Sequence, residues 1–492
     1  MIAALIFIPF FAGLAAFVLR GDLARRGLLV LVAVVHFVLV LACWLHRPQA
    51  ALGGGLGLDS LGLIFLSIAS VLFLMASVYA LGYLRTQPLH PEPDLEGGGL
   101  FGNAPEGVFI GCLLVFLSAM TLVTTSEHLG LLWIGVEATT LAGAPLIYYH
   151  RHHRSLEAVW KYLMICSVGI ALALLGNFFL GVAGSRLPEG KDSMMVSVLV
   201  ENASQLHAPW LRAAFILFLV GYGTKMGLAP LHTWLPDAYS EAPSVVSALL
   251  SGALSNCAFL GVLRVLQVCV AAGLGDFARD LMVIMGLISM GVAAVFILKQ
   301  ADYKRLLAYS SVENMGIMNL GVGLGGAGAF GSMLHAVNHS LIKAMLFLVA
   351  GNILLVFKSK SVSAVRGMTR VMPASGILWI AGFLAITGTP PFGPFISEFT
   401  ILKSAFAHGR FVVGALYMFF LAVIFIGMST VFLRMAQGTT EGTSVTGRVQ
   451  VHPLMTLPPA ILCVAVLILG VYIPPALMGV LMEAARTVGG VI

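Results

Sequence analysis

Residues 223–248 read GTKMGLAPLHTWLPDAYSEAPSVVSA, and this stretch decides how the rest of the chain is interpreted. Lys225 lies within an apolar run that begins near Leu211, and Pro230 follows it. A proline inside a helix lacks the N–H donor, so the carbonyl of Met226 loses its helical partner. Irregular backbone at membrane depth is tolerated only where protein or a water-filled cavity covers it. The stretch therefore predicts a broken membrane helix that carries a charge.

The whole chain shares this membrane character. Of its 492 residues, 59% are hydrophobic and 10% are charged, whereas a typical soluble domain has about 25% charged residues. About fourteen apolar runs of roughly 20 residues each leave little sequence for a soluble domain. These features predict an all-α polytopic membrane protein and exclude a cytosolic enzyme or a nucleic-acid-binding protein.

Fourteen membrane spans are predicted from the apolar runs. They lie near 2–19, 27–45, 60–83, 106–124, 127–149, 157–183, 211–235, 243–270, 276–298, 304–323, 327–357, 375–408, 410–436 and 457–483. The longer polar stretches 86–107 and 185–211 carry no helix or strand pattern that would build a core. The first span begins without a basic segment, so we expect it to be retained rather than cleaved as a signal peptide.

Lysine and arginine residues gather in alternate loops between these spans. The clusters are Arg20/Arg25/Arg26, Arg151/Arg154, Lys299/Lys304/Arg305, Lys358/Lys360/Arg366/Arg370 and Arg434/Arg448. Because short loops rich in basic residues stay on the cytoplasmic side, both termini are expected outside. The predicted location is the cytoplasmic (inner) membrane of a bacterium or archaeon.

A second break is predicted in residues 388–394, which read GTPPFGP. Pro390, Pro391 and Pro394 interrupt the run, and Glu398 follows one turn later. Broken helices at corresponding positions of two halves indicate inverted repeats with an ion path between them. The predicted division is 1–105 (first three helices), 106–270 (first repeat), 271–436 (second repeat) and 437–492 (loop and last helix).

Two charges lie at mid-span, where a lipid-facing helix should carry none. An isolated charge at the position of Glu137 costs at least about 2.5 kcal/mol, so Glu137 is expected to face the protein interior. Lys225 is equally deep. A Glu137–Lys225 pair could exchange protons, because burial favours the uncharged form of both side chains. The alternative is a static ion pair that fixes helix packing. Intramembrane ionisable residues favour the functional interpretation.

His335, His339 and Lys343 recur every four residues and so share one helix face. Such a row could relay protons through water, because histidine titrates near neutral pH. Core packing is the alternative, and a zinc site is disfavoured because no carboxylate or cysteine accompanies the histidines. Glu398 would end the row, unless it only complements the N-terminus of a half-helix.

Other polar residues rank lower as path candidates. Asp237 and Glu241 fit helix capping at a solvated end as well as proton entry, and Glu313 lies about three turns into the tenth span. The remaining candidates are His232, Lys161 and Lys403. The cluster from His150 to Arg154 (HRHHR) is interpreted as a topology anchor or a site for lipid headgroups.

Cofactor motifs are missing from the sequence. The six cysteines, Cys43, Cys112, Cys166, Cys257, Cys269 and Cys463, form no C-x-x-C pair. Residues 321–326 (GVGLGG) lack the context of a dinucleotide fingerprint, and no phosphate loop occurs. We therefore expect no metal, cofactor or redox centre in this chain.

The stretch 223–248 resembles the central signature of the antiporter-like subunits of respiratory complex I, Mrp antiporters and membrane-bound hydrogenases. Residues 301–311 (ADYKRLLAYSS) and 335–344 (HAVNHSLIKA) carry the same resemblance, which covers spans four to thirteen. Residues 136–140 (VEATT), 155–162 (SLEAVWKY) and 310–316 (SSVENMG) resemble the F component of hydrogenase-4 complexes of the formate hydrogenlyase type.

The resemblance implies fourteen helices, inverted five-helix repeats and two half-channels joined by a hydrophilic axis. Glu137 matches the glutamate of the fifth helix, Lys225 the lysine of the seventh and Glu398 the charged position of the twelfth. His339 and Lys343 fall in the basic segment of the eleventh. Two departures are Asn256, where relatives often carry lysine or histidine, and Glu313-Asn314, where many carry Ser-His. We also expect no long lateral helix, because the chain ends soon after the last span.

The implied function is proton translocation in a multisubunit redox complex. A proton would pass from the cytoplasm along Lys225, water, His335/His339/Lys343 and Glu398 to the outside. Expected partners are sister antiporter-like subunits, an anchoring membrane subunit and peripheral hydrogenase and iron-sulfur subunits, with Ni-Fe and iron-sulfur centres in those partners. Open alternatives are a sodium/proton antiporter subunit, the membrane half of a carbon dioxide-hydrating complex, and an anchor whose channels are silent.

Overall fold

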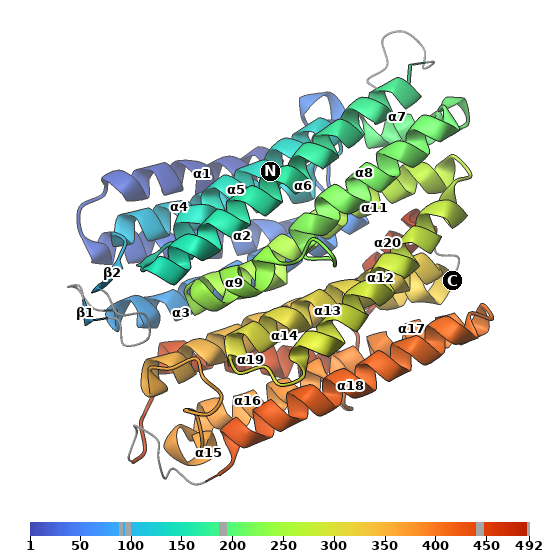
Figure 1. Ribbon diagram of the computed structural model, residues 1–492. Helices are drawn as coiled ribbons and strands as arrows, with labels where there is room; N and C mark the ends of the chain where they lie inside the picture. The colour runs from blue at the N-terminus through green and yellow to red at the C-terminus, as the bar shows by residue number, and fades with distance from the viewer. Residues whose placement is uncertain (88–91, 94–99, 186–193, 439–446, 490–492) are drawn as a thin grey trace.

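The computed structural model describes residues 1–87, 92–93, 100–185, 194–438 and 447–489. Most of these residues form long helices that run side by side along one axis (Figure 1). In this part of the chain, ten helices are long and apolar enough to cross a membrane. Each of the fourteen predicted spans contains at least one helix, so the predicted all-α polytopic fold is confirmed.

The helices follow the predicted spans closely. Before the first break they are α1 (Ile2–Val18), α2 (Asp22–Leu45), α3 (Ser60–Arg85), α4 (Glu106–Thr125), α5 (Leu129–Ile147), α6 (His153–Ala183) and α8 (Ala208–Met226). After it come α9 (Trp234–Glu241), α10 (Ser244–Leu249), α11 (Ser255–Ala271), α12 (Gly275–Ile297), α13 (Tyr303–Leu324), α14 (Gly326–Phe357), α15 (Met368–Val371), α16 (Pro373–Ile386), α17 (Gly393–Ala407), α18 (Phe411–Ala436), α19 (Pro453–Val471) and α20 (Pro475–Thr487). A π-helical segment, η3 (Leu250–Leu254), joins α10 to α11.

Both predicted helix breaks are confirmed. The seventh span ends as α8 at Met226 and resumes as α9 at Trp234, and Gly227 supplies the left-handed cap with φ of 90°. The twelfth span ends as α16 at Ile386 and resumes as α17 at Gly393. Pro230, Pro390 and Pro391 are exposed on the surface of the isolated chain, whereas Pro394 is buried.

The prediction for the last span was wrong in its bounds. Instead of one helix over 457–483, α19 ends at Val471 and α20 begins at Pro475. Pro474 and Pro475 both lack a backbone donor, and a proline disfavours helical geometry at the residue before it. The helix therefore stops before this pair.

The polar stretches contain more order than the sequence predicted. Residues within 86–107 and the loop after α5 form a small antiparallel sheet of β1 (Glu92–Pro93), β2 (Leu100–Asn103) and β3 (His150–Arg151). The short elements η1 (Leu52–Gly54), α7 (Val196–Glu201) and η2 (Ala203–Gln205) lie in other connections. These elements are too short for a hydrophobic period to reveal them.

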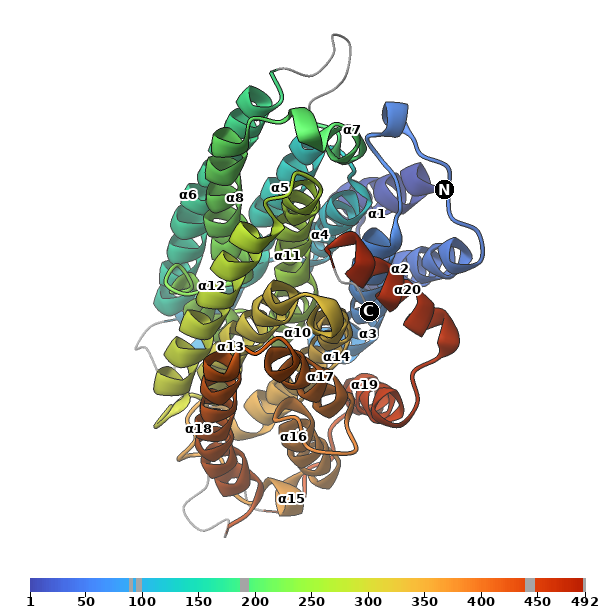
Figure 2. The ribbon, with the colours of Figure 1, turned by 90° about the vertical axis from the view of Figure 1, so that its right-hand side faces the viewer.

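The helix α14 lies near the middle of the bundle (Figure 2). It packs against α3, α10, α13, α16, α17 and α19.

Close approach between other helices depends on small residues. A side chain on Gly221 of α8 would begin 2.6 Å from the carbonyl oxygen of Gly169 on α6. Likewise, a side chain on Gly286 of α12 would begin 2.7 Å from the carbonyl oxygen of Gly316 on α13. Small residues at such contacts are typical of membrane helices.

One ion-pair cluster ties α11 to the first helices. Arg264, which is 1% exposed, donates to both carboxylate oxygens of Asp59 at 2.6 and 2.8 Å and to Glu127 at 2.9 Å. Asp59 also accepts from the backbone N–H of Gly62 and so caps α3. The cluster holds the start of α3 and the turn between α4 and α5 against α11.

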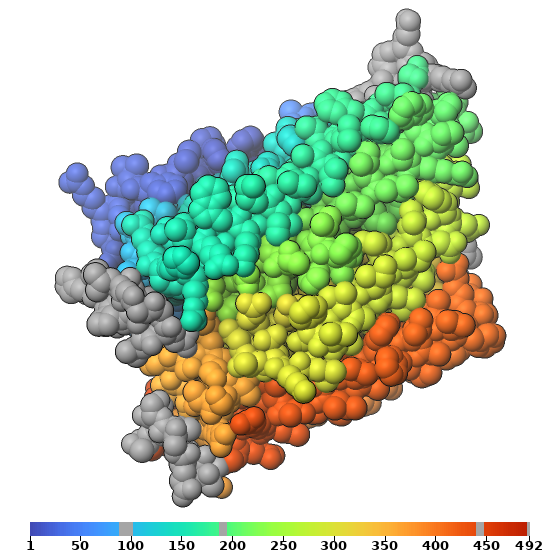
Figure 3. Space-filling view, in the orientation of Figure 1, coloured from blue at the N-terminus to red at the C-terminus, as the bar shows by residue number. Residues whose placement is uncertain are grey.

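The face shown in Figure 3 is formed by α6, α8, α12 and α18 in succession. The exposed large hydrophobic side chains on these helices include Trp160, Phe178, Val295 and Phe419, whereas exposed charges such as Arg154, Asp280 and Arg434 lie nearer the helix ends. Such a surface suits lipid tails or apolar partner helices.

Candidate functional site

Lys225 lies at the C-terminal end of α8 and is fully buried. Its ammonium donates to Thr140 Oγ1 at 2.9 Å and to the Tyr162 hydroxyl at 2.8 Å, and it lies 4.4 Å from the centre of the Tyr162 ring. Thr140 in turn donates to Glu137 Oε2 at 3.3 Å. In the described part of the chain, the link between Glu137 and Lys225 therefore runs through Thr140.

Glu137 is only half-buried, so the expectation that it faces the interior holds in part. Its neighbours on the same side of α5, Ile134 and Leu141, are 50% and 64% exposed. Glu137 thus lies at the border between an apolar outer face and the buried Lys225 site. Neither Thr140 nor Tyr162 was singled out from the sequence, although Thr140 follows Glu137 by three residues on one helix face.

Asn256 connects the first half of the path to α14. It follows the π-helical segment η3, and its side-chain amide donates to Ser340 Oγ at 2.6 Å and to the Gly252 carbonyl at 2.8 Å. Ser340 is the neighbour of His339 on α14. The residue that departs from the expected lysine or histidine is therefore hydrogen-bonded to α14 beside the basic row, and not to a member of the row itself.

The basic row on α14 is aligned as the spacing predicted. The rings of His335 and His339 are stacked, with centroids 6.3 Å apart. His335 contacts Ser397 Oγ and Asn314 Oδ1, each at 2.9 Å. Lys343 donates to the Leu307 carbonyl at 2.5 Å and to the hydroxyl of Ser310 on α13. All three side chains are fully buried.

Two buried carboxylates continue the row toward the second break. Glu313 of α13 is 3% exposed and Glu398 of α17 is 8% exposed. Tyr417 of α18 is buried and close enough to both carboxylates to interact electrostatically. Tyr417 was not identified from the sequence, because a tyrosine in an apolar run carries no distinguishing pattern.

Several buried polar atoms along this row have no hydrogen-bond partner among the described residues. They are Asn256 Oδ1, Glu313 Oε2, Asn319 Oδ1, both amide atoms of Asn338, both ring nitrogens of His339 and the Tyr417 hydroxyl. Leaving one such group unpaired costs about 1–3 kcal/mol. Ordered water is the usual partner of buried polar groups of this kind. The geometry therefore favours a hydrated row rather than a dry core.

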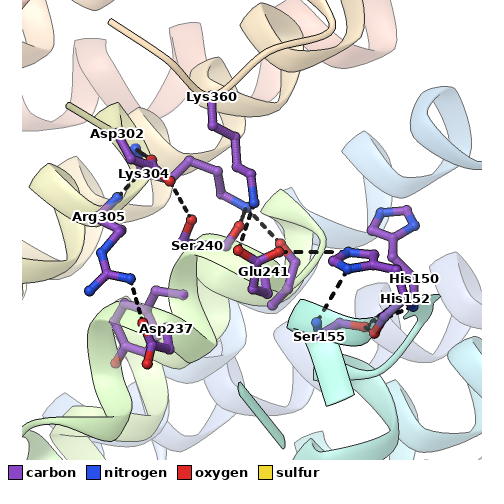
Figure 4. A network of polar contacts seen from close by, with 12 residues as sticks. His150, His152, Ser155, Asp237, Ser240, Glu241, Asp302, Lys304, Arg305 and Lys360 are labelled. Carbon is purple, nitrogen blue, oxygen red and sulfur yellow. Dashed lines mark hydrogen bonds and ion pairs between the residues drawn. The ribbon is translucent and has the colours of Figure 1, made fainter. Parts of the chain in front are cut away.

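Asp237 and Glu241 belong to a separate network of polar contacts around α9 (Figure 4). Asp237 pairs with Arg305 at 2.5 Å and with Lys161 at 2.8 Å. Glu241 pairs with Lys360 at 2.7 Å and lies 3.6 Å from His152. These contacts join α9 to α6, α13 and the segment after α14.

The other low-ranking candidates lie apart from the central row. His232 is buried in the first break beside the Tyr309 ring, with centroids 6.2 Å apart. Lys161 is 43% exposed and pairs with Glu157 and Asp237. Lys403 is exposed on α17.

Of the two roles predicted for the cluster 150–154, headgroup binding does not fit His150 and His152, which make contacts inside the protein, whereas the role as a topology anchor stays a prediction. His150 is 8% exposed, and its ring contacts the Tyr83 hydroxyl and Asn103 Oδ1 at 2.8 Å each. Burial lowers the pKa of His150 to about 3. His152 caps α6 by accepting from the backbone N–H of Ser155. Arg151, His153 and Arg154 are exposed and keep the predicted role as an expectation.

All six cysteines are free thiols, four of them buried. Across the described ranges, no group of three or more His, Cys, Asp or Glu side chains could hold a metal ion. The candidate functional site is therefore the buried row of titratable side chains between the two broken helices.

Comparison with known proteins gives concordant results. The family described as "NADH:quinone oxidoreductase/Mrp antiporter, TM" matches residues 126–427. The chain is 35% identical over 424 residues to the "Hydrogenase-4 component F homolog" of Methylacidiphilum infernorum, and the match covers 85% of each chain.

Two solved structures share the fold. A chain of the membrane-bound sulfane sulfur reductase, an archaeal respiratory membrane complex, superposes with a TM-score of 0.86 at 19% identity, covering 99% of this chain and 98% of that chain. A chain of the Mrp complex from Dietzia sp. superposes with a TM-score of 0.81 at 17% identity, covering 99% and 97%.

Proposed function

The chain belongs to the NADH:quinone oxidoreductase/Mrp antiporter transmembrane family, and we propose that it translocates protons within a multisubunit redox complex. The proposed complex is of the membrane-bound hydrogenase-4 or NADH dehydrogenase-like type, as the name of the relative from Methylacidiphilum suggests. Electron transfer in partner subunits would supply the energy.

One observation carries this proposal. Ionisable and polar side chains from α8, α11, α13, α14 and α17 form a buried row at the level of the two helix breaks, and many of their polar atoms lack a protein partner among the described residues. Burying such groups in a membrane protein is costly, and their usual role is an ion pathway. A purely structural core would satisfy them with protein hydrogen bonds.

In the proposed mechanism, a proton enters from the cytoplasm and passes through Lys225, water and the α14 row to Glu398 before release outside. Glu137 and Lys225 act as the switch, because a shift of charge near Glu137 changes the proton affinity of Lys225 through Thr140. Moving one charge against 100 mV requires about 2.3 kcal/mol. The reaction in the partners must deliver at least this free energy per proton.

Half-exposure of Glu137 supports a partner subunit on this face. A glutamate on an apolar outer face of α5 is unfavourable against lipid, and the exposed prolines of the two breaks need cover for the same reason. We propose that sister and anchoring membrane subunits provide it, and that Ni-Fe and iron-sulfur centres reside in peripheral partners.

The proposed topology follows from the distribution of charge. We propose that the predicted spans cross the membrane in alternation, which places both termini on one side and the basic loops after α1, α12 and α14 on the other. The positive-inside rule then puts the termini outside the cytoplasmic membrane. We also propose residues 106–270 and 271–436 as the two repeats.

The test is to purify the complex through a tag on this chain, identify its partners by mass spectrometry, and measure proton uptake into liposomes. Redox subunits together with uptake that requires their substrates would support the proposal. Uptake that requires sodium would favour the antiporter alternative, which the likeness to the Mrp complex keeps open. Co-purification of a zinc protein that hydrates carbon dioxide would favour the third alternative.

A further inference from the structure

The short helix α9 is held at its C-terminal end by residues of the second half of the chain. Lys304, which is 1% exposed, donates to the carbonyl oxygens of Ser240 at 2.9 Å and Ala242 at 2.6 Å. A lysine in this position satisfies carbonyls that have no helical partner and complements the helix dipole. The ion pairs Asp237–Arg305 and Glu241–Lys360 add two further links to the second half (Figure 4).

The N-terminal end of α9 touches the surroundings of Lys225. Trp234 is fully buried, and its indole N–H donates to the carbonyl of Thr224, the residue before Lys225, at 2.9 Å. Its ring lies 5.1 Å from the Tyr162 ring, centroid to centroid. Tyr162 is the residue whose hydroxyl accepts a hydrogen bond from Lys225.

We propose that Lys304 is a positioning residue for Lys225, and that α9 is the rigid connection through which it acts. Eight helical residues span about 12 Å, so α9 links the Lys304 contacts directly to the Trp234–Tyr162 pair. A movement of α13, or of the segment that carries Lys360, then changes the position of the aromatic side chains around Lys225. The two halves of the chain are coupled at this end of the bundle, separately from the row on α14. This inference rests on the proposed function and specifies how that site is regulated.

Two variants test the connection in the intact complex. Lys304→Met keeps the aliphatic stem and removes the donors, and Trp234→Phe keeps an aromatic ring and removes the indole N–H. Hydrogen exchange of residues 234–242 reports whether α9 is loosened, and proton flux driven by a potassium diffusion potential reports the effect at Lys225. We expect Lys304→Met to accelerate exchange in α9 and to lower flux about tenfold.

The decisive result is the double variant. If both residues act through α9, Lys304→Met changes flux less than about twofold once Trp234→Phe is present, since coupled residues are non-additive. Equal fold-changes in both backgrounds, or unchanged exchange in α9, would overturn the inference. If Lys304→Met does not assemble, Glu241→Gln removes the Lys360 pair from a partly exposed position and is expected to show the same non-additivity.

A matched control comes from the opposite end of the bundle. Arg410 pairs with Asp280 at 2.7 Å on the surface, and Arg410→Gln should leave both the exchange of α9 and the flux unchanged. Failure of the wild-type complex to carry protons would contradict the proposed function, whereas the exchange measurements would still decide whether Lys304 holds α9.

Discussion

The carboxylate of Glu398 occupies the space in which a side chain on Gly388 would begin. Gly388 lies in the second helix break with φ of 63°, a conformation that suits glycine. The break and the carboxylate that ends the buried row are thus fitted to each other, and this contact can be tested directly.

Gly388→Ala should displace Glu398 and lower proton flux about tenfold, because the new methyl group meets the carboxylate. Gly409→Ala is the matched control, since Gly409 has φ of 68° but no atom within 4 Å of the added Cβ. Both variants carry similar backbone strain, so an equal loss of flux would show that strain alone, and not the carboxylate, is responsible. Flux into liposomes and thermal stability in detergent should be measured together.

Thr140→Val should lower proton flux about tenfold, because it removes the hydroxyl that joins Glu137 to Lys225 while keeping the shape. It should also cost about 1–3 kcal/mol of stability, because the buried ammonium of Lys225 loses one of its two acceptors. Thr430→Val is the control. Thr430 is exposed on α18 and donates only to the Ile426 carbonyl of its own helix. Normal transport by Thr140→Val would rule out the bridged switch.

Glu137→Gln should preserve assembly and alter transport, because it keeps a hydrogen-bond acceptor for Thr140 and removes the charge. We expect flux driven by the partner reaction to fall more than flux driven by an imposed potential. An assembled complex with unchanged coupling would contradict the role of Glu137 as part of the switch.

Removal of Arg264 should destabilise the protein strongly. Arg264→Met leaves Asp59 and Glu127 without their shared buried partner, and loss of one member of such a cluster costs about 3–5 kcal/mol. Arg410→Met, which breaks an exposed pair with Asp280, should cost about 0–1 kcal/mol. The comparison requires only thermal unfolding midpoints in one detergent, and similar shifts for both variants would refute the importance of the cluster.

His150 should make stability depend on pH. Its pKa is about 3 in the folded protein because the ring is desolvated, against 6.5 as its ordinary value. The unfolded chain therefore binds more protons between these values, and stability is full above pH 6.5 and falls as the pH drops toward 3, by up to about 1.4 kcal/mol per unit. His150→Gln should flatten the change in unfolding midpoint between pH 7 and 5, whereas substitution of the exposed His46 should not.

The sequence predicted those features that depend on local chemistry. Prolines near Lys225 and Glu398 indicated both helix breaks, and the four-residue spacing of His335, His339 and Lys343 indicated a single helix face that the structure reproduces. Charges in apolar runs identified most members of the buried row, because such residues are exceptional in any membrane helix.

Contacts between helices that lie far apart along the chain could not be predicted from the sequence. The bridge through Thr140, the burial of His150 against Tyr83 and the position of Tyr417 all depend on packing between segments that lie far apart along the chain. Thr140, Tyr162 and Tyr417 are also residue types that occur in membrane cores without any function. Their importance is visible only from what they touch.

The π-helical segment before Asn256 fixes a rotational register. A π turn holds one residue more than an α turn, so everything after it is rotated by about 100° relative to an unbroken α-helix. Removing one residue from Leu250–Leu254 would make the continuous helix formed by α10, η3 and α11 uniformly α-helical. It would also turn Asn256 away from Ser340. A single-residue length change at this point therefore reorients the half of the helix that faces α14 while leaving its composition intact.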